Sequence, residues 1–320
     1  MTTATENIKT SFNDNQNIYS KVTQKIIADL EKGELSWRQK DSQAIHFIRP
    51  LRSNGVPFTG INRLILAGSA SANGFQSPYW MTLRQATDLN ASIPVDQQST
   101  TVVFADKVVT EGQGEDGEPL KQESTQLKEY SVYNADQIEG LQDFHYKKPE
   151  LINKKNRLKT LEKFIAGTKA EINTGSVASY DASSDKIEMT PSSSFANQEA
   201  YYGAVLNELI HWTQHESRLN RDFKKERNGN HILAKEALVA ELGYCFLTAE
   251  LGIEPTADVH SAFVKSWLQI LKHDSKFIFI AASQAQKAVD YLISLQPLNE
   301  PKPRSVAAEP KPSGKANPAF

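Results

Sequence analysis

The segment Leu206–His215, with the sequence LNELIHWTQH, constrains this chain more than any other. On a helix, residues four apart share a face, so Asn207, His211 and His215 would lie along one stripe. Zinc peptidases carry two histidines on such a stripe, and a glutamate directly after the first takes a proton from metal-bound water. Here Glu208 has the position of that general base and His211 that of the second ligand, while Asn207 replaces the first ligand.

The segment 235–241, KEALVAE, adds an independent signal to this pattern. It places Glu236 and Glu241 on a largely apolar helix downstream, the arrangement in which a second helix supplies a carboxylate ligand. Without it, the pattern around Asn207 would be typical of many amphipathic helices. An amide oxygen is a poor zinc ligand beside an imidazole, so the ordinary site is broken at position 207.

Two hypotheses for a metal site follow from these residues. In the first, the site is degenerate, and Asn207 leaves Zn²⁺ or another divalent metal weakly bound or absent. In the second, His211 and His215 hold a metal between them, with Glu236 or Glu241 completing the rearranged site of an active peptidase. With His211 as the first ligand, Glu208 no longer directly follows it, which weakens the case for Glu208 as the base.

Length and charge restrict the classes of protein further. A chain of 320 residues is long for one compact core and predicts two domains. A net charge of −2 counts against duplex-DNA binding driven by phosphate neutralisation. Single-strand binding stays open, because bases can stack on aromatic rings. The chain has one cysteine and no run approaching the ~20 apolar residues that span a bilayer. We therefore expect a soluble, cytoplasmic protein with no membrane partner.

Apolar periodicity, β-branched runs and turn residues predict the secondary structure. Helices are expected over residues 18–30, 197–217, 230–251, 258–272 and 274–295. Strands are expected at Thr101–Phe104 and Glu129–Tyr133, with an exposed loop over 111–126 between them, and a hairpin at Ser179–Thr190. The predicted organisation is a disordered N-terminus (1–16), a first domain (17–147), a linker or helix (148–172), a second domain (173–296) and a disordered Pro- and Lys-rich tail (297–320).

The order of motifs resembles the ArdC family of plasmid-borne antirestriction proteins over residues 17–295. The N-terminal resemblance comprises Ile26–Gly33, Trp37, Gly60–Asn62, Tyr79–Thr82, Arg84–Ala86, Tyr133–Asn134 and Gln137–Leu141. The C-terminal resemblance comprises Asp185–Ile187, Phe195, Tyr201–Tyr202, Glu208–Thr213, Arg218–Leu219, Glu236, Leu238–Leu242, Ser266–Leu268 and Leu271. This resemblance implies an N-terminal single-stranded-DNA-binding domain and a C-terminal zincin-like metallopeptidase domain.

Two departures from the family pattern accompany the resemblance. Asn207 stands where the family has its first metal-binding histidine, which argues against hydrolysis. The segment 94–99, PVDQQS, replaces a basic, glycine-containing turn and so removes cations that could meet phosphates.

The residues expected to bind DNA combine aromatic rings with nearby cations. They are Trp37, Tyr79 and Trp80 as stacking platforms, Arg63 and Arg84 as phosphate partners, and Asn62 in the turn after Gly60. Trp37 lies in a polar loop between Glu34 and Arg38, so it is the best candidate for an exposed ring. The alternative for any one of these rings is packing in the core of the first domain.

Together the residues and the resemblance favour an α+β protein of mobile elements that binds and protects single-stranded DNA during plasmid conjugation. Its second domain would be a degenerate peptidase with Asn207, Glu208, His211 and Glu236 at the former site. One alternative is an active zinc peptidase with the rearranged site. Another is a module that binds a host protein and has neither activity.

Overall fold

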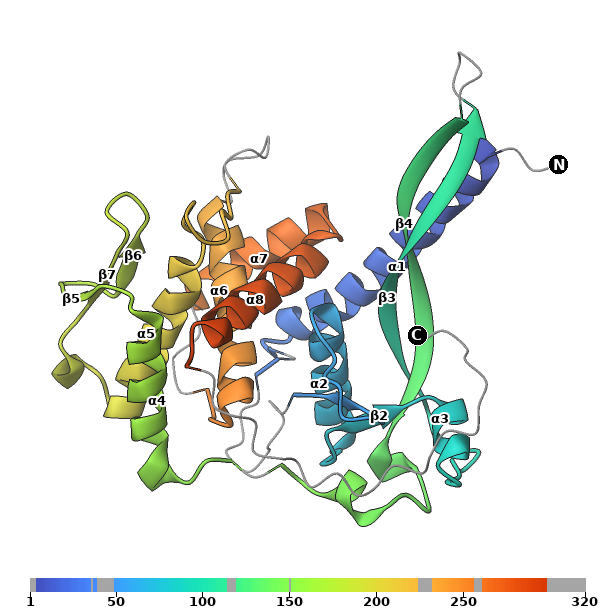
Figure 1. Ribbon diagram of the computed structural model, residues 1–320, viewed down its shortest axis with the longest axis horizontal. Helices are drawn as coiled ribbons and strands as arrows, with labels where there is room; N and C mark the ends of the chain where they lie inside the picture. Colours follow the sequence, from blue (N-terminus) through green and yellow to red (C-terminus); the bar gives the residue numbers. More distant parts are fainter. Residues whose placement is uncertain are drawn as a thin grey trace.

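The computed structural model describes residues 4–35, 37–38, 49–113, 119–149, 151–223, 232–255 and 261–297. It has two parts that each mix helices with a small sheet, which confirms the α+β class (Figure 1). The predicted tail lies outside the described residues apart from Pro297.

The N-terminal part is built around a four-stranded sheet with the strand order β1-β2-β4-β3. Its elements are α1 (Ala4–Glu31), β1 (Leu51–Arg52), α2 (Ile61–Asn73), β2 (Tyr79–Met81), α3 (Leu83–Asp88), β3 (Thr100–Gln113), β4 (Pro119–Asn134), and the short 3₁₀ helices η1 (Ala135–Gln137) and η2 (Asp143–Tyr146). Strand β1 runs parallel to β2, and the other pairs are antiparallel. In Figure 1 the β3–β4 ribbon extends away from the rest of the molecule, with α1 alongside it.

Two elements of this part are longer than the sequence predicted. The β3–β4 ladder continues from Thr100↔Val132 to Gln113↔Pro119, so most of the predicted loop over 111–126 is paired strand. Backbone hydrogen bonds between antiparallel neighbours need no apolar alternation, which is the signal that the prediction used. Helix α1 begins at Ala4 rather than after residue 16. Once the packed turns around Ile18 and Ile26 nucleate a helix, each added residue costs little.

The C-terminal part is mainly helical, with a three-stranded sheet in the order β5-β7-β6. Its elements are α4 (Lys154–Thr168), β5 (Ile172–Thr174), β6 (Ser179–Asp181), β7 (Lys186–Met189), the 3₁₀ helix η3 (Ser192–Ser194), α5 (Gln198–Trp212), α6 (Ile232–Leu251), α7 (Ser261–His273) and α8 (Phe277–Ser294). The predicted hairpin is confirmed as β6–β7. Helix α6 is buried along most of its length between α5, α7 and α8, as its continuous apolar sequence requires.

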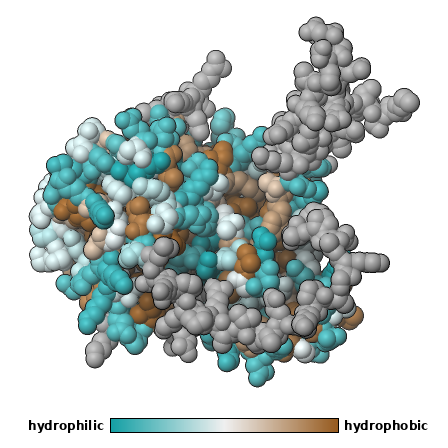
Figure 2. All heavy atoms as spheres, in the orientation of Figure 1, coloured by the Kyte–Doolittle hydropathy of each residue, from teal (hydrophilic) through white to brown (hydrophobic). Residues whose placement is uncertain are grey.

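The two parts share one hydrophobic core. Ile26 and Leu30 from α1, Trp37 from the following loop and Leu64 from α2 belong to the same buried cluster as helices α5–α8. On the face seen in Figure 2, hydrophobic residues are scattered among hydrophilic ones. The N-terminal part is therefore docked on the helical part rather than tethered to it.

Candidate zincin-like site and DNA-binding face

Helix α5 carries the residues of the expected site. Asn197 caps its N-terminus, accepting a hydrogen bond from the backbone N–H of Ala200 at 2.8 Å. Asn207 and Glu208 are buried, and His211 follows one turn after Asn207 with its side chain 19% exposed.

Helix α6 brings Glu236 against His211, with 3.2 Å between Oε1 and Nδ1. A residue that the sequence reasoning missed completes this cluster. Arg221 donates from Nε to Glu236 Oε2 at 2.8 Å and from Nη2 to Oε1 at 2.6 Å. It also donates to the Ile210 carbonyl at 3.0 Å and to the Thr213 hydroxyl at 3.2 Å. The buried guanidinium thus ties the C-terminus of α5 to α6.

The charges in this cluster support one another. Burial alone would raise the pKa of Glu236, but hydrogen bonds from Arg221 and His211 hold that pKa below its usual value. Burial alone would lower the pKa of His211, but its hydrogen bond to Glu236 and the carboxylate charge raise it above the usual value. Glu236 is therefore held as a carboxylate between two nitrogen donors.

The two other predicted ligands lie elsewhere, which corrects the rearranged site. Glu241 faces away from His211 and accepts hydrogen bonds from Arg38 at 2.5 and 2.8 Å and from Trp37 Nε1 at 3.3 Å. Helix α5 ends at Trp212 rather than at residue 217, so His215 lies in a turn beyond it. There its Nδ1 accepts a hydrogen bond from the Ser217 backbone N–H at 3.2 Å.

The helix ends early because its last carbonyls are already bonded. The Ile210 carbonyl accepts from Arg221 and from the Thr213 hydroxyl, and the chain then turns back. Throughout the described residues, no three His, Cys, Asp or Glu side chains are grouped as a metal site would require. The rearranged set of His211, His215 and a glutamate is therefore not assembled there.

The remaining donor set differs from that of a catalytic zinc centre. It consists of one imidazole whose Nδ1 faces a carboxylate, one amide at Asn207, and a carboxylate whose two oxygens already accept from Arg221. A tetrahedral catalytic site needs three strong donors and an open position. In metal sites, a carboxylate that contacts one ring nitrogen of a histidine typically orients that ring, whose other nitrogen binds the metal. The carboxylate itself is then not a ligand.

Four of the six expected DNA-binding residues, Trp37, Asn62, Arg63 and Trp80, are buried, and the prediction that Trp37 has an exposed ring is wrong. Trp37 is 1% exposed, because its ring fills the shared core and its Nε1–H bonds to Glu241. Arg63 bonds to Glu250 and to the Phe246 carbonyl across the interface between the two parts. Asn62 exchanges two hydrogen bonds with the backbone of Val103.

The other predicted aromatics, Tyr79 and Trp80, lie on strand β2 of the N-terminal sheet. Trp80 is buried and packs edge-on against Phe75. Tyr79 is half-buried between Phe144 and His145, and Arg84 is exposed on α3. Of the six candidates, only Tyr79 and Arg84 keep contact with solvent.

The β3–β4 ribbon carries a different aromatic face, which the sequence reasoning did not identify. Its register pairs Val102 with Tyr130 and Phe104 with Lys128, so these side chains share one side. The Phe104 and Tyr130 ring centroids are 5.5 Å apart, and Tyr130 is 37% exposed. The Arg52 guanidinium lies over Phe104 at 5.2 Å. Period-two alternation along both strands is the signal that could have indicated this face.

Comparison with known proteins identifies the arrangement. A family model for the N-terminal domain of anti-restriction factor ArdC matches residues 16–133, and a zincin-like metallopeptidase model matches residues 159–284. The metal-free crystal structure of antirestriction protein ArdC from plasmid R388 is 38% identical, with a TM-score of 0.73, and the match covers 87% of this chain and 97% of that one. The chain belongs to the ArdC family.

Other members and relatives agree with this assignment. The Mn(II)-bound structure of R388 ArdC is 36% identical, with a TM-score of 0.71 and coverage of 88% and 99%. The uncharacterized protein y4eC of Sinorhizobium fredii (strain NBRC 101917 / NGR234) is 31% identical over 87% of this chain and 92% of its own length. Two Escherichia coli proteins named DNA primase TraC are 29% and 30% identical over 86% and 87% of this chain, which spans 20% and 27% of their lengths.

No helix in the described part of this ArdC-family chain is long and apolar enough to cross a membrane.

Proposed function

We propose that this ArdC-family chain is an antirestriction protein that binds single-stranded DNA on the ribbon face formed by Arg52, Phe104, Lys128 and Tyr130. The observation that supports this most is the aromatic pair Phe104–Tyr130, because bases of any sequence can stack on such rings. Arg52 is held over Phe104 and over Phe58, at 5.4 Å from the Phe58 ring, beside this pair. The face needs no strongly basic surface, in keeping with the net charge of −2.

We further propose that the zincin-like domain is a degenerate peptidase. Its support is the donor set: Asn207 replaces an imidazole, and Glu236 is already held by Arg221. We expect any divalent metal to bind weakly to the wild-type chain. The domain would then act as a scaffold for the N-terminal part, through the buried contacts of Arg63 and Trp37.

Replacing Tyr130 with alanine is expected to weaken single-strand binding by about 5- to 150-fold, which corresponds to the loss of one base stack. Fluorescence anisotropy with a labelled oligothymidine, in parallel with a duplex of the same length, measures this change. Wild-type protein should prefer the single strand.

Phe144→Ala provides the matched control, because Phe144 is an exposed ring on η2, outside the ribbon face. Its binding should stay near the wild-type value. If only Phe144→Ala lost binding, the DNA would instead contact the surface around Tyr79 and Phe144. A wild-type protein that binds neither form of DNA would contradict the proposed function and favour a host protein as the target.

A further inference from the structure

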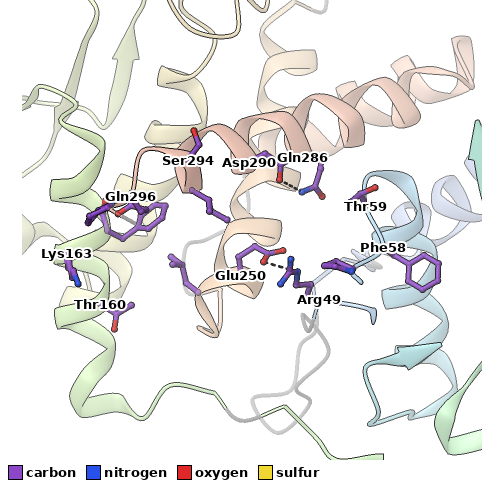
Figure 3. Close-up of a pocket in the computed structure, with 15 residues that line it drawn as sticks. Arg49, Phe58, Thr59, Thr160, Lys163, Glu250, Gln286, Asp290, Ser294 and Gln296 are labelled. Atoms are coloured by element: carbon purple, nitrogen blue, oxygen red, sulfur yellow. Dashed lines mark hydrogen bonds and ion pairs between the residues drawn. The ribbon is translucent and has the colours of Figure 1, made fainter. Parts of the chain in front are cut away.

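A cleft lies between helix α4 of the zincin-like part and the segment of the N-terminal part that contains Arg49 and Phe58 (Figure 3). Its volume is about 740 Å³, within the range of pockets that hold ligands of nucleotide size. Figure 3 shows Thr160 and Lys163 on α4 at one wall, with Arg49 and Phe58 on the other side. Both parts of the chain thus contribute polar side chains to one space.

The charge of this cleft favours an anionic ligand. Glu250 pairs with Arg49 at 3.0 Å and with the buried Arg63 at 3.0 Å, so two guanidinium groups more than neutralise it. The Arg49 side chain remains 40% exposed, and Lys163 is exposed on the opposite wall. The one other carboxylate that lines the cleft, Asp290, accepts a hydrogen bond from Gln286 at 2.9 Å. Two cations and two carboxylates line the cleft, and the buried Arg63 behind Glu250 adds one further positive charge.

A buried ring, Phe58, which is 3% exposed, lies between the cleft and the aromatic face of the ribbon. Phe58 lines the cleft, and its ring centroid lies 6.4 Å from that of Phe104. The Arg52 guanidinium covers both rings. A strand whose bases stack on Phe104 and Tyr130 would pass Arg52 and Phe58 on its way to the cleft.

We propose that single-stranded DNA runs from the ribbon face into this cleft, where Arg49 and Lys163 contact its phosphates. This proposal rests on the proposed function and adds the zincin-like part to the DNA-binding surface. It also gives the degenerate domain a role that requires no metal. Lys159, one turn from Lys163 on α4, is exposed and extends the same cationic stripe.

The test compares Lys163→Gln with Lys265→Gln in the full chain. Lys265 is an exposed lysine of α7 that does not line the cleft. Oligothymidines of about 4 and about 16 nucleotides, the range of single-strand site sizes on small binding domains, serve as probes. For the longer probe, Lys163→Gln should reduce the slope of log K against log salt by about 0.7, the value for one lost phosphate contact. For the short probe it should have no effect, because that probe fits on the ribbon face.

The outcomes separate this inference from the proposed function. If Lys163→Gln and Lys265→Gln have equal affinity and equal salt slope with the longer probe, the cleft is not part of the DNA path. In that case the ribbon face would still be supported if Tyr130→Ala weakened binding. If Arg49→Gln bound the longer probe with the affinity and salt slope of the wild-type protein, the path through the cleft would also be wrong. Absence of any binding by wild type would contradict both proposals.

Discussion

Replacing Arg221 with methionine is expected to lower the free energy of unfolding by about 3–5 kcal/mol, the usual cost of removing one partner from a buried ion pair. The Arg221 side chain is 1% exposed, and its guanidinium donates one hydrogen bond to each carboxylate oxygen of Glu236. Methionine of similar length fills the space but leaves the carboxylate buried with only His211 nearby. Urea denaturation followed by circular dichroism measures the change through the transition midpoint and the slope.

Lys186→Met is the matched control for this measurement. Its ion pair with Glu171 has a similar length, 2.8 Å, but the two side chains are 45% and 55% exposed. Surface pairs of this kind contribute about 0–1 kcal/mol. If Arg221→Met were as stable as Lys186→Met, Glu236 would not depend on Arg221 for its charge. The double variant Arg221→Met/Glu236→Gln should recover part of the loss, because it removes the unpaired charge.

Replacing Asn207 with histidine is expected to raise bound zinc from well below one equivalent to about one per chain. The substitution places two imidazoles four residues apart on α5, with Glu208 directly after the first. Restoring a direct ligand should raise the affinity for zinc by more than about 10–100-fold, the effect typical of residues that only hydrogen-bond to the ligands. Elemental analysis after dialysis, and titration against a zinc indicator, measure stoichiometry and affinity without any assay of hydrolysis.

Two variants define what the result means. Asn207→Ala removes the amide without adding a donor, so it should bind no more zinc than wild type. His211→Ala added to Asn207→His should abolish the gain, because one histidine then remains on the stripe. A wild-type protein that already carries one tightly bound metal would contradict the degenerate site. Zinc-free Asn207→His protein would show that Glu236, held by Arg221, cannot also serve as a ligand.

The aromatic candidates show why local sequence misled the prediction of exposure. Trp37 has polar neighbours in the chain, which predict a solvent-facing loop. Its ring is buried because the loop packs against α6, and its Nε1–H bonds to a carboxylate 204 residues away in the chain. No property of residues 34–38 encodes that partner. Phe104 and Tyr130 were overlooked for the opposite reason, since their shared face exists only once β3 and β4 pair in register.

Glu236 and Glu241 illustrate the same limit at the candidate site. The sequence placed both on one apolar helix, and at 3.6 residues per turn their side chains differ in direction by about 140°. Which of them meets His211 depends on how α6 rotates against α5. Close packing of Gly243 against Ile210 leaves no room for another rotation: a Cβ on Gly243 would lie 2.8 Å from Ile210 Cγ2.

By itself, the sequence determined the α+β class, the order of motifs that marks the ArdC family, and the helix that carries Asn207, Glu208 and His211. Those features depend on periodicity and residue type, which can be read from residues close together in the sequence. The tertiary structure decided the rest: Glu236 as the partner of His211, Arg221 as its counter-charge, and Glu241 as the partner of Arg38. Such buried charges are stable only when elements distant in sequence bring donors and acceptors together, so packing alone selects the pairs.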